Sequence, residues 1–218
     1  MKFRDRQEAG RRLAAQLLFL RDQHPVVLAL PRGGVPVGYE VAEALAAPLD
    51  VILVRKIGAP GMPELALGAI VGGERQDEVL DERLVAELAV PRSYLAKQIT
   101  AQAAEIERRR GLYCRDRPPV PLAGRCAIVV DDGIATGATV RAALLAIGRR
   151  RPSRCVLAAP VAPQETIERL RPEADEIVCL STPEDFYAIG QFYDDFHQLS
   201  DDEVLSYLDR AAGRAIRH

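Results

Sequence analysis

Two adjacent carboxylates, Asp131 and Asp132, follow the short apolar run from Cys126 to Val130. Such a run predicts a buried strand, and the residues that follow a strand of a parallel sheet lie at its carboxyl edge, where ligands bind. Carboxylates accept hydrogen bonds from hydroxyl groups or hold a metal ion, but they do not bind phosphate. The pair is therefore a candidate site for sugar hydroxyls or for a metal.

A loop of small residues follows the acidic pair and leads into a helical pattern that begins near Thr139. Small residues leave backbone N–H groups uncovered, and threonine hydroxyls add hydrogen-bond donors. The N-terminus of the following helix adds the positive end of its dipole at the same place. The loop therefore predicts a phosphate site. Its candidate residues are Gly133, Ala135, Thr136, Gly137, Ala138 and Thr139.

The whole segment, VVDDGIATGAT, resembles the ribose-phosphate signature of the type I phosphoribosyltransferases. That signature is an apolar strand, two acidic residues and a T-G-x-T loop. The resemblance implies that Asp131 and Asp132 bind the 2′ and 3′ hydroxyls of phosphoribosyl pyrophosphate, and that Ala135 to Thr139 bind its 5′ phosphate. One alternative is a generic strand with a glycine-rich turn, and another is a receiver-type phosphorylation site. No sequence after Asp132 supplies the later aspartate that a receiver requires.

The tetrapeptide Pro31-Arg32-Gly33-Gly34 follows a second predicted strand, Val26 to Leu30, and precedes a predicted helix, Val37 to Leu45. An arginine beside two glycines brings a fixed cation and open amides together, which suits an oxyanion. By itself the tetrapeptide is equally typical of an ordinary turn. It resembles the pyrophosphate loop of the same family, in which the backbone is often cis, so we predict a cis peptide between Arg32 and Gly33.

Arg55 and Lys56 stand at the end of a third predicted strand, Asp50 to Val54. A glycine- and proline-rich stretch follows, for which we expect irregular structure, and then an antiparallel hairpin that pairs Ala66 to Val71 with Glu78 to Leu80. The resemblance to the type I phosphoribosyltransferases implies that this stretch is a flexible lid over the reaction centre. Arg55 and Lys56 match a basic element that contacts pyrophosphate.

The rest of the chain alternates predicted strands, Cys155 to Val161 and Glu176 to Leu180, with a helix from Gln164 to Leu170. This alternation predicts an α/β fold with a Rossmann-like central parallel sheet and helices on both faces. A further long helix is expected from Ser93, as its cap, to Gly111. Ser200 and Glu203 predict a capping box at the start of a last helix, which runs through Leu208.

We expect one phosphoribosyltransferase domain over residues 1–218. Its core would span about residues 20–182, and a small hood would form from the N-terminal helix and residues 183–218. Aromatic side chains gather in the second part of this hood, where they could stack on a base, although packing against the core is the favoured interpretation. The N-terminal helix, capped by Asp5, carries several arginines that we interpret as a solvated face. The aromatic residues of the hood are Phe186, Tyr187, Phe192, Tyr193 and Phe196. The arginines of the N-terminal helix are Arg4, Arg6, Arg11 and Arg12.

The composition gives 29 basic and 31 acidic side chains and a net charge of −2, so no overall positive field attracts nucleic acid. Four cysteines show no CxxC pairing and are interpreted as small core residues in a reducing compartment. The sequence contains neither a secretion signal nor an apolar run of membrane-spanning length. We expect a cytoplasmic protein without nucleic-acid or membrane partners.

The resemblance implies transfer of the phosphoribosyl group to a nitrogen nucleophile with release of pyrophosphate. Mg²⁺ would be the cofactor, and Asp131 and Asp132 would meet it through water or ribose hydroxyls rather than directly. Arg32 and Lys56 are expected to share the leaving-group charge. Ala135 stands where hypoxanthine-guanine enzymes carry an aspartate, which puts that specificity in doubt. The alternative function is a non-catalytic regulator that binds phosphoribosyl pyrophosphate or a nucleotide, and a homodimer is expected in either case.

Overall fold

The computed structural model describes residues 1–72, 76–115 and 117–215. Within these ranges the centre of the fold is a five-stranded sheet with the strand order β2-β1-β6-β7-β8, and all neighbouring strands are parallel. The predicted parallel sheet is therefore confirmed. Its strands are β1 (Pro25–Ala29), β2 (Leu49–Val51), β6 (Cys126–Val130), β7 (Arg154–Val161) and β8 (Glu176–Ser181).

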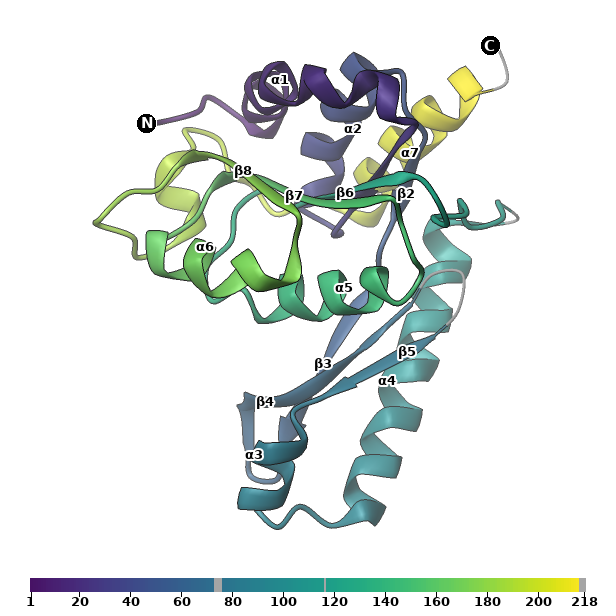
Figure 1. Ribbon diagram of the computed structural model, residues 1–218, viewed down its shortest axis with the longest axis vertical. Coiled ribbons are helices and arrows are strands. Elements are labelled where there is room, and N and C mark those ends of the chain that lie inside the picture. The colour runs from purple at the N-terminus through teal and green to yellow at the C-terminus, as the bar shows by residue number, and fades with distance from the viewer. Residues whose placement is uncertain (73–75, 116, 216–218) are drawn as a thin grey trace.

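Helices cover both faces of this sheet, as predicted (Figure 1). Successive strand residues point to opposite faces, so each strand contributes to two cores. Val27 and Ile128 pack on the face covered by α1 and α2, the helices at residues 6–17 and 34–45. Leu28 and Val129 pack on the opposite face, against α5, the helix at residues 138–148. The first face carries α1 (Arg6–Leu17), α2 (Gly34–Leu45) and α7 (Asp201–Ala215), and the second carries α5 (Ala138–Gly148) and α6 (Gln164–Leu170). Short 3₁₀ turns follow at Leu18–Gln23, Arg171–Glu173 and Ile189–Phe192.

A second, antiparallel sheet in the order β3-β4-β5 projects from the central sheet (Figure 1). We call residues 54–113 the arm. Its elements are β3 (Val54–Ala59), β4 (Met62–Val71), β5 (Asp77–Leu80), α3 (Glu82–Glu87) and α4 (Arg92–Tyr113). Two predictions were wrong here. The third predicted strand ends at Val51, so Arg55 and Lys56 lie inside β3, and the stretch expected to be irregular is a hairpin. Gly61, with a φ of 72°, allows the tight turn that pairs Ala59 with Met62.

The long helix of the arm also differs from its predicted limits. The residue before α4 is Pro91, and Ser93 lies inside the helix without a side-chain cap. Gly111 does not end the helix, because α4 continues to Tyr113. Tyr113 is buried, and its hydroxyl donates to the Asp201 carboxylate. This contact ties the end of the arm to the start of α7.

The segment from residue 182 to residue 200, here called the hood segment, packs on the N-terminal residues. Phe3 N donates to Phe192 O at 2.8 Å and Asp194 N donates to Phe3 O at 2.9 Å. Phe192 and Tyr193 are buried beside Phe3, so these two side chains pack in the core as predicted, whereas Tyr187 is 87% exposed. The extent of the hood as a separate unit stays a prediction.

Two predicted helix caps are confirmed. Asp5 accepts from Glu8 N at 2.7 Å at the start of α1. Ser200 and Glu203 exchange the reciprocal bonds of a capping box at the start of α7. Across the described residues, no helix has both the length and the apolar character needed to span a membrane.

A buried ion pair joins the arm to the core. Arg150 Nη2 lies 3.2 Å from Asp77 Oδ2, and each side chain is 7% exposed. Asp77→Asn would remove the negative charge that faces the Arg150 guanidinium at this buried contact, so we expect the free energy of unfolding to fall by about 1.5–3 kcal/mol in urea titrations. The exposed pair Arg83–Glu87 provides the control, because Arg83→Gln should change stability by less than about 0.5 kcal/mol. Similar effects of the two substitutions would contradict this assignment.

Candidate functional site

The two predicted ligand loops lie side by side because β1 and β6 are neighbouring parallel strands. Their register places Ala29 opposite Val130, so the residues after each strand leave the sheet at the same level. Leu30 N donates to Val130 O at 2.9 Å. A Cβ atom on Gly34 would lie 2.6 Å from that same carbonyl oxygen. The glycine therefore permits α2 to start directly against β6.

Gly33 and Asp132 are in direct contact across the two loops. A Cβ atom on Gly33 would lie 2.1 Å from Asp132 Oδ2, which leaves no space for any other residue type there. The cis peptide lies between Pro31 and Arg32, one bond earlier than predicted. The Arg32 carbonyl instead accepts from Val35 N at 3.2 Å and belongs to the start of α2. Gly34 N donates to Leu30 O, so the role of Gly34 is close packing rather than an open amide.

The predicted phosphate loop wraps the N-terminus of α5. Gly137 adopts a φ of 77° immediately before the helix, a left-handed conformation that favours glycine. Thr166 Oγ1 donates to Ala135 O at 2.7 Å and fixes the loop from the side of α6. Gly133 differs from the rest of the loop, because it is buried under Ile189 of the hood segment. The exposed members of the loop are Ala135, Thr136, Ala138 and Thr139.

The sequence interpretation missed the role of one residue, Arg6. Arg6 Nε lies 2.7 Å from Asp132 Oδ2, and the two residues are only 8% and 7% exposed. Its guanidinium stacks over the ring of Phe196 at 3.9 Å, and its Nη1 donates to His197 O at 3.0 Å. The signal was present, because position 6 shares a helix face with Ala9, Leu13 and other buried residues of α1. A charge on that apolar face indicates a buried partner.

The acidic pair is electrostatically unequal. Burial raises the pKa of Asp131 well above its usual value, and the negative charge of Asp132 adds to this shift. Burial also raises the pKa of Asp132, but the Arg6 guanidinium opposes the shift by hydrogen bonding and charge. The two carboxyl groups titrate together, and the Arg6 cation favours the negative charge on Asp132. Asp131 Oδ1 meanwhile accepts from Asp132 N at 2.9 Å.

A pocket of 350 Å³, here called the hood pocket, brings three predicted site residues together. Arg32, Gly33 and Asp132 line it from the sheet edge. The hood segment closes the other side with Phe196, His197, Gln198 and Leu199, and α1 contributes Arg6.

His197, at the rim of the hood pocket, does not offer a free base. Its ring nitrogens lie 2.9 Å from Glu203 Oε1 and 3.0 Å from Asp195 Oδ1. These carboxylates raise the pKa of His197, with Glu203 making the larger contribution. The histidine therefore connects the hood segment to the first turn of α7.

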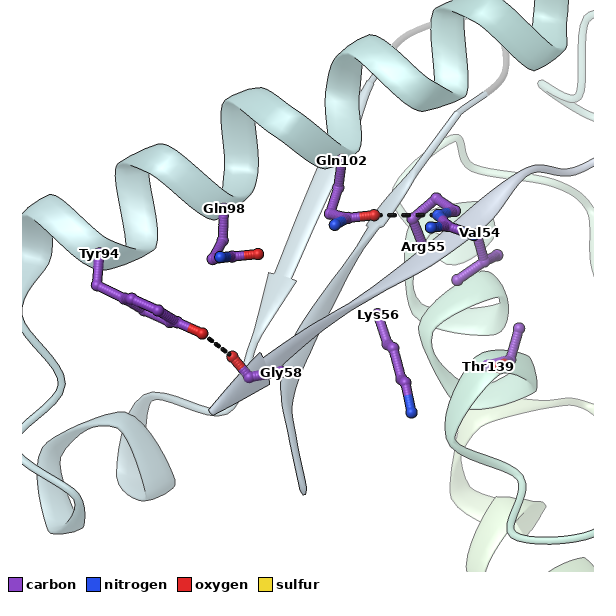
Figure 2. A pocket seen from close by; sticks show the side chains of 8 residues that line it. All are labelled: Val54, Arg55, Lys56, Gly58, Tyr94, Gln98, Gln102 and Thr139. Atoms are coloured by element: carbon purple, nitrogen blue, oxygen red, sulfur yellow. Dashed lines mark hydrogen bonds between the residues drawn. The ribbon is translucent and has the colours of Figure 1, made fainter. Parts of the chain in front are cut away.

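A second pocket of 460 Å³ lies between the arm and the phosphate loop, and we call it the arm pocket (Figure 2). Lys56 of β3 and Thr139 of α5 both line it, and the Lys56 side chain points away from α4. Arg55 turns toward α4 instead, where its Nε donates to Gln102 Oε1 at 3.0 Å. Lys56 and Arg32, both predicted to meet pyrophosphate, thus line different pockets.

Comparisons with known proteins show which family this chain belongs to. The profile of the phosphoribosyl transferase domain family matches residues 4–197. A Mycobacterium tuberculosis H37Rv protein named "Putative phosphoribosyl transferase Rv0571c" is 48% identical over 209 residues, which are 96% of this chain and 47% of that protein. The chain thus spans about half the length of the curated relatives it matches.

Two solved structures share the fold. The protein TT1426 from Thermus thermophilus is 46% identical, with a TM-score of 0.85 over 95% of this chain and 98% of that one. A hypothetical protein from Neisseria gonorrhoeae, solved with bound ppGpp, has a TM-score of 0.51 over 98% of this chain and 99% of that one, but is 16% identical and shows a common fold alone.

The fold and the family match define the class of this protein. The chain belongs to the phosphoribosyl transferase domain family, and the resemblance to the type I phosphoribosyltransferases is confirmed.

The contact between the two loops predicts a specific intolerance at Gly33. Gly33→Ala would push a methyl group against a carboxylate that Arg6 holds in place, so we expect a loss of about 1–3 kcal/mol in the free energy of unfolding. Gly148→Ala is the matched control, because an added Cβ there meets no atom within 4 Å. The control should be neutral or stabilising by up to about 1 kcal/mol. Denaturant titration of both variants gives the comparison, and equal stabilities would refute the contact.

Proposed function

We propose that this chain is a phosphoribosyltransferase that transfers the 5-phosphoribosyl group from phosphoribosyl pyrophosphate to a nitrogen nucleophile, with a nucleobase as the proposed class of acceptor. The observation that carries the proposal is the contact of Gly33 with Asp132. It joins a loop suited to an oxyanion with a carboxylate suited to sugar hydroxyls. The exposed loop at the N-terminus of α5 stands next to the same acidic pair and suits a phosphate.

The parts of the donor would then be shared among these elements. The 5′ phosphate would lie on the backbone amides between Ala135 and Thr139. Asp131 and Asp132 would accept hydrogen bonds from the ribose hydroxyls through their carboxyl oxygens, with Asp132 as the charged partner of Arg6. Arg32 would face the pyrophosphate from the hood pocket. Lys56, on the arm, would add a second cation from the opposite side.

The reaction would leave the ribose ring with partial positive charge and the departing pyrophosphate with negative charge. A nearby carboxylate stabilises the positive charge of the ribose ring, and fixed cations stabilise the negative charge of the pyrophosphate. Holding donor and acceptor in one orientation supplies a further part of the rate. Residues of the hood segment and of the arm would exclude water from the two sides of the donor.

The donor set suits Mg²⁺ in a restricted way. Among the described residues no cluster of three or more His, Cys, Asp or Glu side chains could hold a metal ion. Mg²⁺ keeps several waters and takes few protein ligands beside substrate phosphates, so the Asp131–Asp132 pair would suffice, acting through water or the ribose hydroxyls. Bound Mg²⁺ would neutralise part of the phosphate charge.

The test measures turnover and stability in parallel. The protein is incubated with phosphoribosyl pyrophosphate, Mg²⁺ and a panel of purine, pyrimidine and pyridine bases, and ribosylated product is detected by mass spectrometry. We expect Arg32→Ala and Asp132→Asn each to lower kcat/KM by about 100-fold or more, because each removes a group aimed at transition-state charge. Arg32→Ala should leave the melting temperature nearly unchanged.

Asp194→Asn is the matched control, because Asp194 is exposed and pairs with Lys2 away from the two pockets. It should retain wild-type turnover. A fall in turnover that only follows a fall in melting temperature would contradict the assignment. Binding of the donor without any product would instead favour a regulator.

A further inference from the structure

We propose that Arg6 is a positioning residue for the sugar donor: it holds the Asp132 carboxylate in the orientation that receives the ribose hydroxyls. This inference rests on the proposed function. It concerns a residue of α1 that lies 126 positions before its partner in the sequence. None of the family's signature segments contains it.

The Arg6 side chain is fixed by three different contacts. Its Nε donates to the Asp132 carboxylate, and its Nη1 donates to the carbonyl oxygen of His197. The guanidinium also stacks on the ring of Phe196. A guanidinium is planar and carries several N–H donors in a fixed geometry, so it can make all three contacts at once. A lysine ammonium is a compact charge that has no planar face to stack on an aromatic ring. The contacts therefore define the direction of the guanidinium as well as its charge.

Asp132 is held between Arg6 and the Gly33 backbone. Its Oδ2 is the atom that contacts Arg6 Nε, and it is also the atom nearest to the position that a Gly33 Cβ would occupy. Tyr193 Oη donates to the backbone oxygen of Asp132 at 2.6 Å and fixes the main chain beneath the carboxylate. With both its main chain and one carboxylate oxygen fixed, Asp132 has little freedom to choose another orientation.

Stability alone does not account for this arrangement. Removing both ions of a buried pair from water costs several kcal/mol, and well-packed apolar side chains at such positions are often equally stable or more stable. An apolar residue at position 6 could pack on Phe196, but it could not donate to the Asp132 carboxylate. The gain specific to arginine is the placement of the Asp132 carboxylate.

A double-mutant cycle tests whether Arg6 acts through Asp132. Binding of phosphoribosyl pyrophosphate with Mg²⁺ is measured by titration calorimetry for the wild-type chain, Arg6→Met, Asp132→Asn and the double variant. We expect Arg6→Met to weaken binding by about 10- to 100-fold, since a misplaced contact can cost about 100-fold. In the Asp132→Asn background the same substitution should change binding by less than about twofold, because coupled residues are non-additive.

Two further variants keep the result interpretable. Arg11→Met removes an exposed arginine of the same helix, which pairs with Glu40 at 3.4 Å, and it should bind as the wild type does. Arg6→Lys keeps the positive charge but lacks the planar guanidinium with its several donors. It should bind phosphoribosyl pyrophosphate with an affinity between those of the wild type and Arg6→Met. If Arg6→Met does not fold, Arg6→Lys and Arg6→Lys/Asp132→Asn take the place of the two methionine variants in the cycle.

The outcomes separate this inference from the function on which it rests. Wild-type protein that does not bind the donor refutes the proposed function. Wild-type binding together with unchanged affinity in Arg6→Met refutes the role of Arg6. Equal losses in both backgrounds also refute it, because they would show a structural effect that does not pass through Asp132.

Discussion

The parallel pairing of β1 with β6 is the constraint on which the site depends. With Ala29 opposite Val130, the chain leaves both strands at one level, and two loops far apart in the sequence must share the same space. Only glycine fits where they touch, since the Asp132 carboxylate occupies the place of a side chain on Gly33. The sheet thus determines which loops meet, and the glycines determine how closely. The carboxyl edge of a parallel sheet is where such open α/β folds place their ligands.

Around this contact the site is closed from two sides by unrelated parts of the chain. The hood segment and α1 approach the acidic pair through Arg6, Phe196 and His197. The arm approaches the phosphate loop through Lys56. In the proposed function, Arg32 and Lys56 would approach the pyrophosphate of the donor from these two sides. The buried ion pair of Arg6 with Asp132 gives the otherwise acidic centre a fixed distribution of charge.

Periodicity and local chemistry predicted most of the fold. The limits of α6 and the caps at Asp5 and Ser200 follow from short-range patterns, and the structure has them as predicted. The position of Lys56 could not be predicted, because the break between β2 and β3 depends on tertiary packing of the arm. The expectation that Arg6 belongs to a solvated face is wrong, although its position on the apolar face of α1 indicates burial. Its partner, by contrast, is set by long-range packing that no local pattern contains.

The most direct measurement is a crystal structure of the protein with ribose 5-phosphate. We expect the phosphate to contact backbone N–H groups between Ala135 and Thr139, and the ribose hydroxyls to contact the carboxylates of Asp131 and Asp132. A phosphate held in the arm pocket by Lys56, with no sugar contact to the acidic pair, would contradict it.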